Sequence, residues 1–167
     1  MQTVRKNPKA LLLSFALVLA LIYGCASAIS KQTKKAADKD LKFEELAKDP
    51  QAHAGKLVIL GGSIISVTNL PAGTEIIILE RPLMSNQKPK SGDVSRGRFI
   101  VKSNKFLDAA IYKSNRFITV AGKVVGAETR PLGESTFNYP VIEEVELYLW
   151  TEESNKPKLN IGIGVGI

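Results

Sequence analysis

The sequence contains few of the residue types from which metal sites, disulfides and covalent active sites are built. Its 167 residues include one cysteine, Cys25, and one histidine, His53. One cysteine excludes an internal disulfide, and one histidine with one cysteine cannot supply the nitrogen and sulfur ligands of a zinc site. The chain also lacks the G-x-S-x-G and P-loop motifs. We therefore predict that the protein is not an enzyme and has no catalytic, cofactor-binding or metal-binding residue.

The excess of positive over negative charge is also small. The chain has 23 basic and 16 acidic residues, which gives a formal net charge of +7. Three of the basic residues and none of the acidic ones lie within residues 1–24, so the remainder has 20 basic against 16 acidic residues and a net charge of +4. A nucleic-acid-binding domain needs a concentrated basic face, so this balance predicts no nucleic-acid partner.

The first 24 residues have the pattern of a bacterial export signal. A basic start without acids precedes the apolar run LLLSFALVLALIYG, which is too short to span a membrane comfortably. Gly24 stands directly before Cys25, and Ile22 lies three positions before the cysteine. The end of the apolar run, up to Cys25, resembles the lipobox of bacterial lipoproteins. Tyr23, two positions before the cysteine, is bulkier than the small residue that is usual there. The resemblance implies that the Cys25 thiol receives a diacylglycerol, that the chain is cut before it, and that the new amine is acylated.

Four segments follow from this pattern and from composition. We predict a lipoprotein signal peptide at 1–24, a lipidated cysteine with a flexible tether at 25–40, a β-barrel domain at 41–153 and a flexible glycine-rich tail at 154–167. The tether includes Lys31, Lys34, Lys35 and Lys39, which either contact anionic headgroups or simply form a solvated linker. Ala26 stands where an Asp favours retention in the inner membrane of lipoprotein-bearing bacteria, so the resemblance implies the outer membrane.

The domain reads as strands with short helices. Residues 41–48 have helical spacing ended by Pro50, and five stretches rich in Val and Ile predict strands. The predicted strands are 56–69, 74–83, 98–103, 115–128 and 141–150. A glycine pair at 61–62 predicts a bend in the first strand. A second short helix is expected at 105–112, and a turn-rich loop at 131–140.

This order is typical of an OB-fold. The fold class is therefore mainly β, an OB-fold-like antiparallel barrel of five to six strands with one or two short helices. In the last strand Val141, Glu143, Val145, Leu147 and Leu149 share one face, which is expected to point into the core.

An ordered set of segments resembles one known family. GKLVILGGSIISVTN, TEIIILERPL, GRFIV, KFLDAAIY, RFITVAGKVVG and YPVIEEVELYLW, behind the lipobox, resemble the Slp family of outer-membrane lipoproteins. The family commonly has Arg-Trp where this chain has Ile59-Leu60, a Pro at Ala109 and a Gly at Asn115, so the chain resembles a divergent member. The resemblance implies lipid attachment to the outer membrane, with the barrel facing the periplasm, and a role in envelope stress or stationary phase. It implies no reaction.

A candidate ligand or partner surface consists of basic and aromatic residues of the domain. These are Arg96, Arg98, Arg116, Tyr139 and Trp150. The alternative is that the arginines are solvated and that the aromatic residues fill the barrel.

Three functions remain open from the sequence. The first is a non-enzymatic envelope protein with a structural or accessory role, whose partner is an envelope protein or a glycolipid. The second is an OB-fold binder of an envelope oligosaccharide or anionic glycolipid. The third and least favoured is a cell-wall-acting enzyme, because two glycosidase carboxylates meet in space rather than in sequence.

Overall fold

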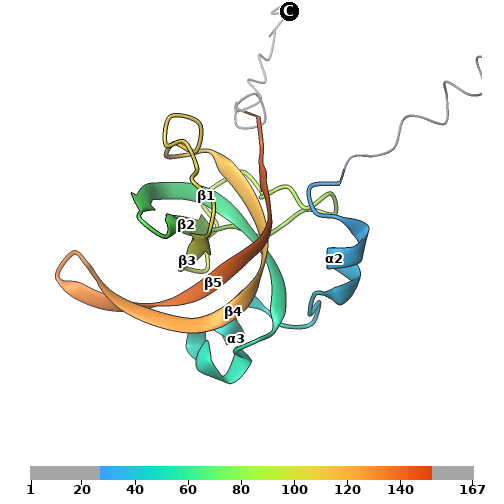
Figure 1. Ribbon diagram of the computed structural model, residues 1–167. Coiled ribbons are helices and arrows are strands. Elements are labelled where there is room, and N and C mark those ends of the chain that lie inside the picture. Colours follow the sequence, from blue (N-terminus) through green and yellow to red (C-terminus); the bar gives the residue numbers. More distant parts are fainter. Residues whose placement is uncertain (1–26, 152–167) are drawn as a thin grey trace, which may run out of the picture.

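Five β-strands dominate the part of the chain that the structure, a computed structural model, describes, which is residues 27–151 (Figure 1). They are β1 (Leu57–Leu70), β2 (Gly73–Glu80), β3 (Arg98–Ser103), β4 (Phe117–Leu132) and β5 (Ser135–Leu149). The strands close a barrel in the order β1-β2-β3-β5-β4, and β4 pairs with β1. The mainly β, OB-fold-like barrel with short helices is therefore confirmed. One seam differs from the expected antiparallel pairing, because β5 runs parallel to β3.

Alternating apolar side chains fill the barrel. In β2 every second residue is buried, and Ile76 and Ile78 are fully enclosed. The predicted first helix exists as α3 (Phe43–Lys48), and it covers one end of the barrel. Its Phe43 ring lies 6.0 Å from the ring of Phe99 in β3, and Leu46 is almost completely buried beside them. The helix therefore closes the core at that end.

The first strand bends as its glycine pair predicts. β1 pairs with β2 on one side and with β4 on the other, and its register against β2 shifts between Ile64 and Ser66. A Cβ on Gly62 would lie 2.0 Å from the carbonyl oxygen of Leu79 in β2. Only glycine permits this close approach of the two backbones.

Two local expectations are wrong. Residues 105–112 form no helix but a turn, in which the Asp108 carboxylate accepts a hydrogen bond from Ala110 N–H (2.8 Å) and competes with helical pairing. Residues 131–140 are mostly strand, because β4 and β5 continue as a two-stranded arm to the tight turn at 133–134. Gly133 supplies the positive φ (62°) that this turn needs.

The predicted core face of β5 is correct for only one half of the strand. Leu147 and Leu149 pack against the core, but so does Ile142, whereas Val145 is 46% exposed. The register against β4 shifts at this point, and the extra residue reverses which side chains face inward. Val141 is buried in a separate cluster outside the barrel core.

The predicted flexible tether is wrong for residues 27–40. This segment contains α2 (Lys31–Ala36), with Ser30 as its N-cap, and is packed on the barrel. Ile29, Thr33 and Ala37 are buried and recur every four residues. Thr33 lies within α2, and Ile29 and Ala37 flank the helix on either side, so one side of the segment is enclosed. The predicted signal peptide, Cys25 and the glycine-rich tail lie outside the described residues.

Candidate ligand-binding cleft

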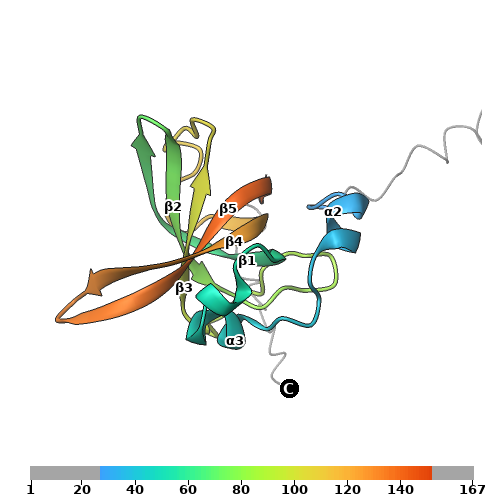
Figure 2. The same cartoon turned by 60° about the horizontal axis from the view of Figure 1, so that its bottom comes forward.

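The outer halves of β4 and β5 form an arm that projects beyond the barrel (Figure 2). Its base is fixed to the outer wall by charge pairs, since Arg130 binds both carboxylate oxygens of Glu75 in β2 at 2.6 Å. Lys102 of β3 also binds Glu128 of the arm. A second apolar cluster, Ile100, Tyr139 and Val141 with Ile77 against it, lies under the arm. The arm is therefore held in place by the barrel wall.

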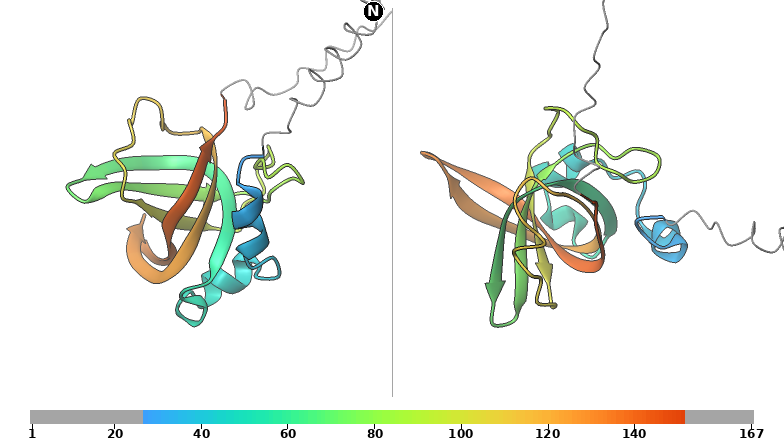
Figure 3. Two further views of the ribbon diagram at one scale, coloured as in Figure 1. Left: turned by 45° about the vertical axis from the view of Figure 1, so that its right-hand side comes forward. Right: turned by 90° about the horizontal axis from the view of Figure 1, so that it is seen from above.

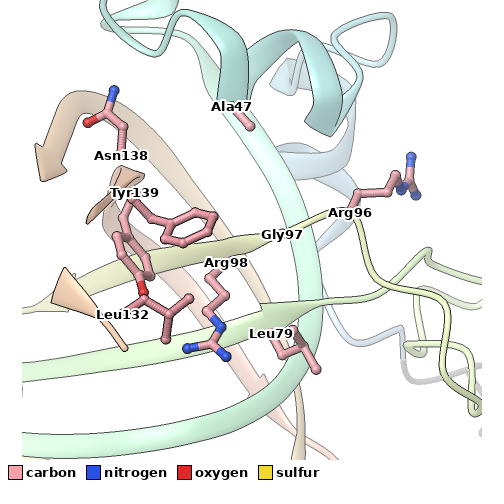
Figure 4. Close-up of a pocket in the computed structure, with 9 residues that line it drawn as sticks. Ala47, Leu79, Arg96, Gly97, Arg98, Leu132, Asn138 and Tyr139 are labelled. Atoms are coloured by element: carbon pink, nitrogen blue, oxygen red, sulfur yellow. The ribbon is translucent and has the colours of Figure 1, made fainter. Parts of the chain in front are cut away.

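A cleft of about 320 Å³ lies between this arm, β2, β3 and α3 (Figure 4). Its walls are mostly apolar. It is lined by Ala47, Leu79, Arg96, Gly97, Arg98, Leu132, Phe137, Asn138 and Tyr139. Phe137 is 50% exposed at the rim, whereas Tyr139 is only 4% exposed, so the cleft has an exposed edge and a buried floor.

The two arginines of this cleft have different surroundings. The guanidinium of Arg96 points away from the cleft and pairs with Glu44 (3.1 Å) and Glu80 (3.2 Å). The side chain of Arg98 extends along the cleft wall toward Leu132, and it has no hydrogen-bond or ion-pair partner among residues 27–151. Arg98 is therefore the cation that this cleft can offer to a ligand.

Arg96 has a structural role. The Glu80 carboxylate is 4% exposed and also accepts a hydrogen bond from the backbone N–H of Arg96 at 3.1 Å. Burial raises the pKa of Glu80, and the bonds from Arg96 oppose that increase only in part. The pair fixes the loop before β3 to α3 and β2, which sets the position of Arg98 two residues later.

The other two predicted surface residues lie elsewhere. Arg116 donates to the carbonyl oxygens of Ile111 (2.9 Å) and Trp150 (2.5 Å). The indole N–H of Trp150 donates to Thr119 Oγ1 at 3.0 Å. Arg116 and Trp150 thus stabilise the strand ends near the N-terminal segment, while Arg96, Arg98 and Tyr139 meet in the cleft.

Sequence reasoning missed Leu79, Leu132, Phe137 and Asn138. The last three belong to the arm, where the turn-forming residues of 131–140 predict a loop and not a strand. The pattern of β-forming residues at 136–139 was the available signal.

A smaller polar hollow of about 210 Å³ is lined in part by Glu143 and Glu144. The Glu144 side chain is 3% exposed and pairs with Lys105 at 2.6 Å. Residues 27–151 contain no group of three or more His, Cys, Asp or Glu side chains that could hold a metal ion. No helix in the same residues has the length and hydropathy of a membrane span.

A closed five-stranded barrel with a largely apolar cleft on its wall defines the chain as a small β-barrel protein. The family model described as outer membrane lipoprotein Slp family matches residues 22–162, and the chain belongs to this family. Membrane association as a lipoprotein is thus a property of its family.

Two relatives illustrate the family. A protein of Haemophilus influenzae, described as uncharacterized, is 32% identical over 135 residues, which cover 79% of this chain and 73% of the relative. The uncharacterized lipoprotein YeaY of Escherichia coli (strain K12) is 26% identical over 137 residues, which cover 82% of this chain and 69% of the relative. No solved structure matches the chain significantly.

Proposed function

We propose that this protein is a non-enzymatic lipoprotein, anchored in the outer membrane by acyl chains on Cys25 and facing the periplasm. Its role is an accessory one in the envelope under stress, in which the arm cleft binds an anionic glycolipid. The observation that carries the choice of ligand is the combination of apolar walls with Arg98, a guanidinium that has no partner among residues 27–151.

Each part of such a ligand has a counterpart in the cleft. A guanidinium binds phosphate or carboxylate through two parallel hydrogen bonds. Leu79, Leu132 and Phe137 offer apolar contact to an acyl chain. A free oligosaccharide would place hydroxyl groups against these walls, so a glycolipid is favoured over it. The volume of about 320 Å³ suits one anionic headgroup or part of one chain.

The same lining favours binding over catalysis. A glycosidase needs two carboxyl groups on either side of the scissile bond. The nine residues that line the cleft include no Asp, Glu, His, Cys or Ser. A cell-wall-acting enzyme would therefore have to use a different surface.

The test compares two ligands and two proteins. Full-length lipoprotein in detergent is titrated calorimetrically with deep-rough lipopolysaccharide and with the same glycolipid after enzymatic dephosphorylation. For the wild type, removal of the phosphates should weaken binding roughly tenfold, the value of one charged hydrogen-bond pair. The Arg98→Gln variant should bind both glycolipids alike, at the weaker level.

Lys123→Gln is the matched control, because it removes one positive charge from an exposed position in β4 outside the cleft. It should bind like the wild type. If Arg98→Gln retains the full preference for the phosphorylated glycolipid, then Arg98 is not the anion site and the proposed ligand is wrong.

A further inference from the structure

The N-terminal segment is attached to the barrel from its first described residue. Gln87 accepts hydrogen bonds through its side-chain oxygen from Ser27 Oγ (3.2 Å) and from the backbone N–H of Ile29 (3.1 Å). The carbonyl oxygen of Gln87 accepts a bond from the buried Thr119 of β4 at 2.7 Å. Ile29 itself is completely buried. Gln87 thus joins the start of the segment to the barrel wall.

A second group of bonds holds α2. The Glu146 carboxylate of β5 accepts hydrogen bonds from Ser30 N–H (2.8 Å), Ser30 Oγ (2.7 Å) and Thr33 Oγ1. After the helix, Asp38 N–H donates to the Leu57 carbonyl oxygen at 2.8 Å. The segment is therefore bonded to the barrel before, within and after α2.

This attachment leaves almost no free chain between the lipidated cysteine and the first residue bonded to the barrel. Cys25 precedes Ser27 by two residues, and two extended residues span at most about 7 Å. We infer that the barrel does not swing on a tether but rests on the outer membrane with a fixed face, the α2 face, defined as the exposed side of α2 with the adjoining start of the segment at Ser27. This inference depends on the proposed lipidation of Cys25.

The charge of this face suits anionic headgroups. Lys31, Lys34 and Lys35 lie three and four residues apart, so they share the side of α2 opposite the buried Thr33. The helix KQTKKA contains no acidic residue. Lys34 also donates to Ser27 Oγ at 2.9 Å, which links the basic side to the start of the segment. The chemistry of an anionic lipid surface therefore matches the face that the anchor brings to it.

The opposite side of the molecule carries the arm. Figures 1 and 2 and the right-hand view of Figure 3 show α2 and the β4–β5 arm on opposite sides of the barrel. With the α2 face on the membrane, the arm and its cleft point away from that membrane. A ligand would then reach the cleft from the periplasmic side.

The test measures the height of two positions above the lipid. Lys35→Cys on α2 and Glu134→Cys at the arm tip are both exposed. Each can be labelled alone with a donor dye, because acylation occupies the natural thiol. The full-length lipoproteins are placed in vesicles of phosphatidylethanolamine and phosphatidylglycerol with acceptor-labelled headgroups. A domain of about 125 residues is roughly 35 Å across, so energy transfer from position 35 should exceed that from position 134 by about twofold or more.

A linker variant supplies the control. About 20 Gly and Ser residues inserted between Ala26 and Ser27 have an r.m.s. length of ~25 Å, which should make transfer from the two positions nearly equal. Equal transfer without the linker would overturn the fixed orientation. Intact-mass measurement of the same samples tests lipidation separately. An unmodified Cys25 would contradict the proposed anchor, whereas a lipidated protein with equal transfer would contradict only the orientation.

Discussion

At the scale of single residues, the barrel depends on positions where two backbones nearly touch. Gly62 of β1 is such a position, because its missing Cβ would lie 2.0 Å from Leu79 O and 2.7 Å from Ile78 Cγ2. Backbone cannot move aside as a flexible side chain can. A methyl group at this position must therefore separate β1 from β2.

We accordingly expect Gly62→Ala to lower the free energy of unfolding by about 3 kcal/mol or more. Urea denaturation of the purified protein measures this change. Gly133→Ala serves for comparison, since a Cβ there meets nothing and only the positive φ of 62° is costly, by about 1 kcal/mol. Equal losses for the two variants would contradict a steric role of Gly62.

At the scale of elements, α2 shows how one carboxylate can hold a polar helix. Burial raises the pKa of Glu146, but the hydrogen bonds from Ser30 and Thr33 outweigh this effect and hold the pKa below the ordinary value of a glutamic acid. A carboxyl group with a lowered pKa stabilises the docked state fully above its ordinary pKa. That stabilisation is lost as the pH falls through the lower, folded-state pKa.

For this reason Glu146→Gln should loosen α2 without unfolding the barrel. Loss of about 1 kcal/mol of docking energy should raise amide hydrogen exchange at 30–37 about fivefold, while amides of β1–β5 stay protected. Acidification of the wild type below the ordinary pKa of a glutamic acid should act in the same direction, because it protonates Glu146. Glu143→Gln, at an exposed position of the same strand, should leave exchange at 30–37 unchanged. If Glu143→Gln accelerates exchange at 30–37 as much as Glu146→Gln does, Glu146 has no specific role in holding α2.

At the scale of the whole molecule, a closed barrel carries two attachments, the N-terminal segment and the arm. The arm contacts the outer wall through its own apolar cluster and the Arg130–Glu75 pair, while the barrel core lies on the other side of the wall. The arm therefore contributes to the cleft but not to the barrel core, so a change in the arm can affect the proposed ligand binding without removing core contacts.

Shortening the arm should separate these properties. Glu128 and Tyr139 face each other in register, so an Asn-Gly turn in place of residues 129–138 can close the hairpin there. The barrel should retain its far-UV circular dichroism and lose no more than about 2 kcal/mol of stability. Glycolipid binding should disappear, because the arm wall of the cleft is removed together with Leu132, Phe137 and Asn138. A variant that is unfolded, or that still binds, would contradict this division.

Local patterns in the sequence were sufficient to predict many of the secondary-structure elements of this protein. The alternation in β2, the glycine pair of β1 and the Pro50 stop after α3 each act within a few residues, so they can be predicted without partners. The order of these elements predicted the barrel, and the set of segments around them predicted the family that the comparison shows.

Tertiary structure alone decided the features on which the proposals depend. The attachment of residues 27–37 relies on Gln87 and Glu146, which follow it by 58 and 116 residues. The reversal of β5 at Val145 comes from its pairing with β4, and the cleft exists only because the arm lies over β2 and β3. Each of these depends on contacts between distant segments, whereas the sequence determined only what neighbouring residues can decide between themselves.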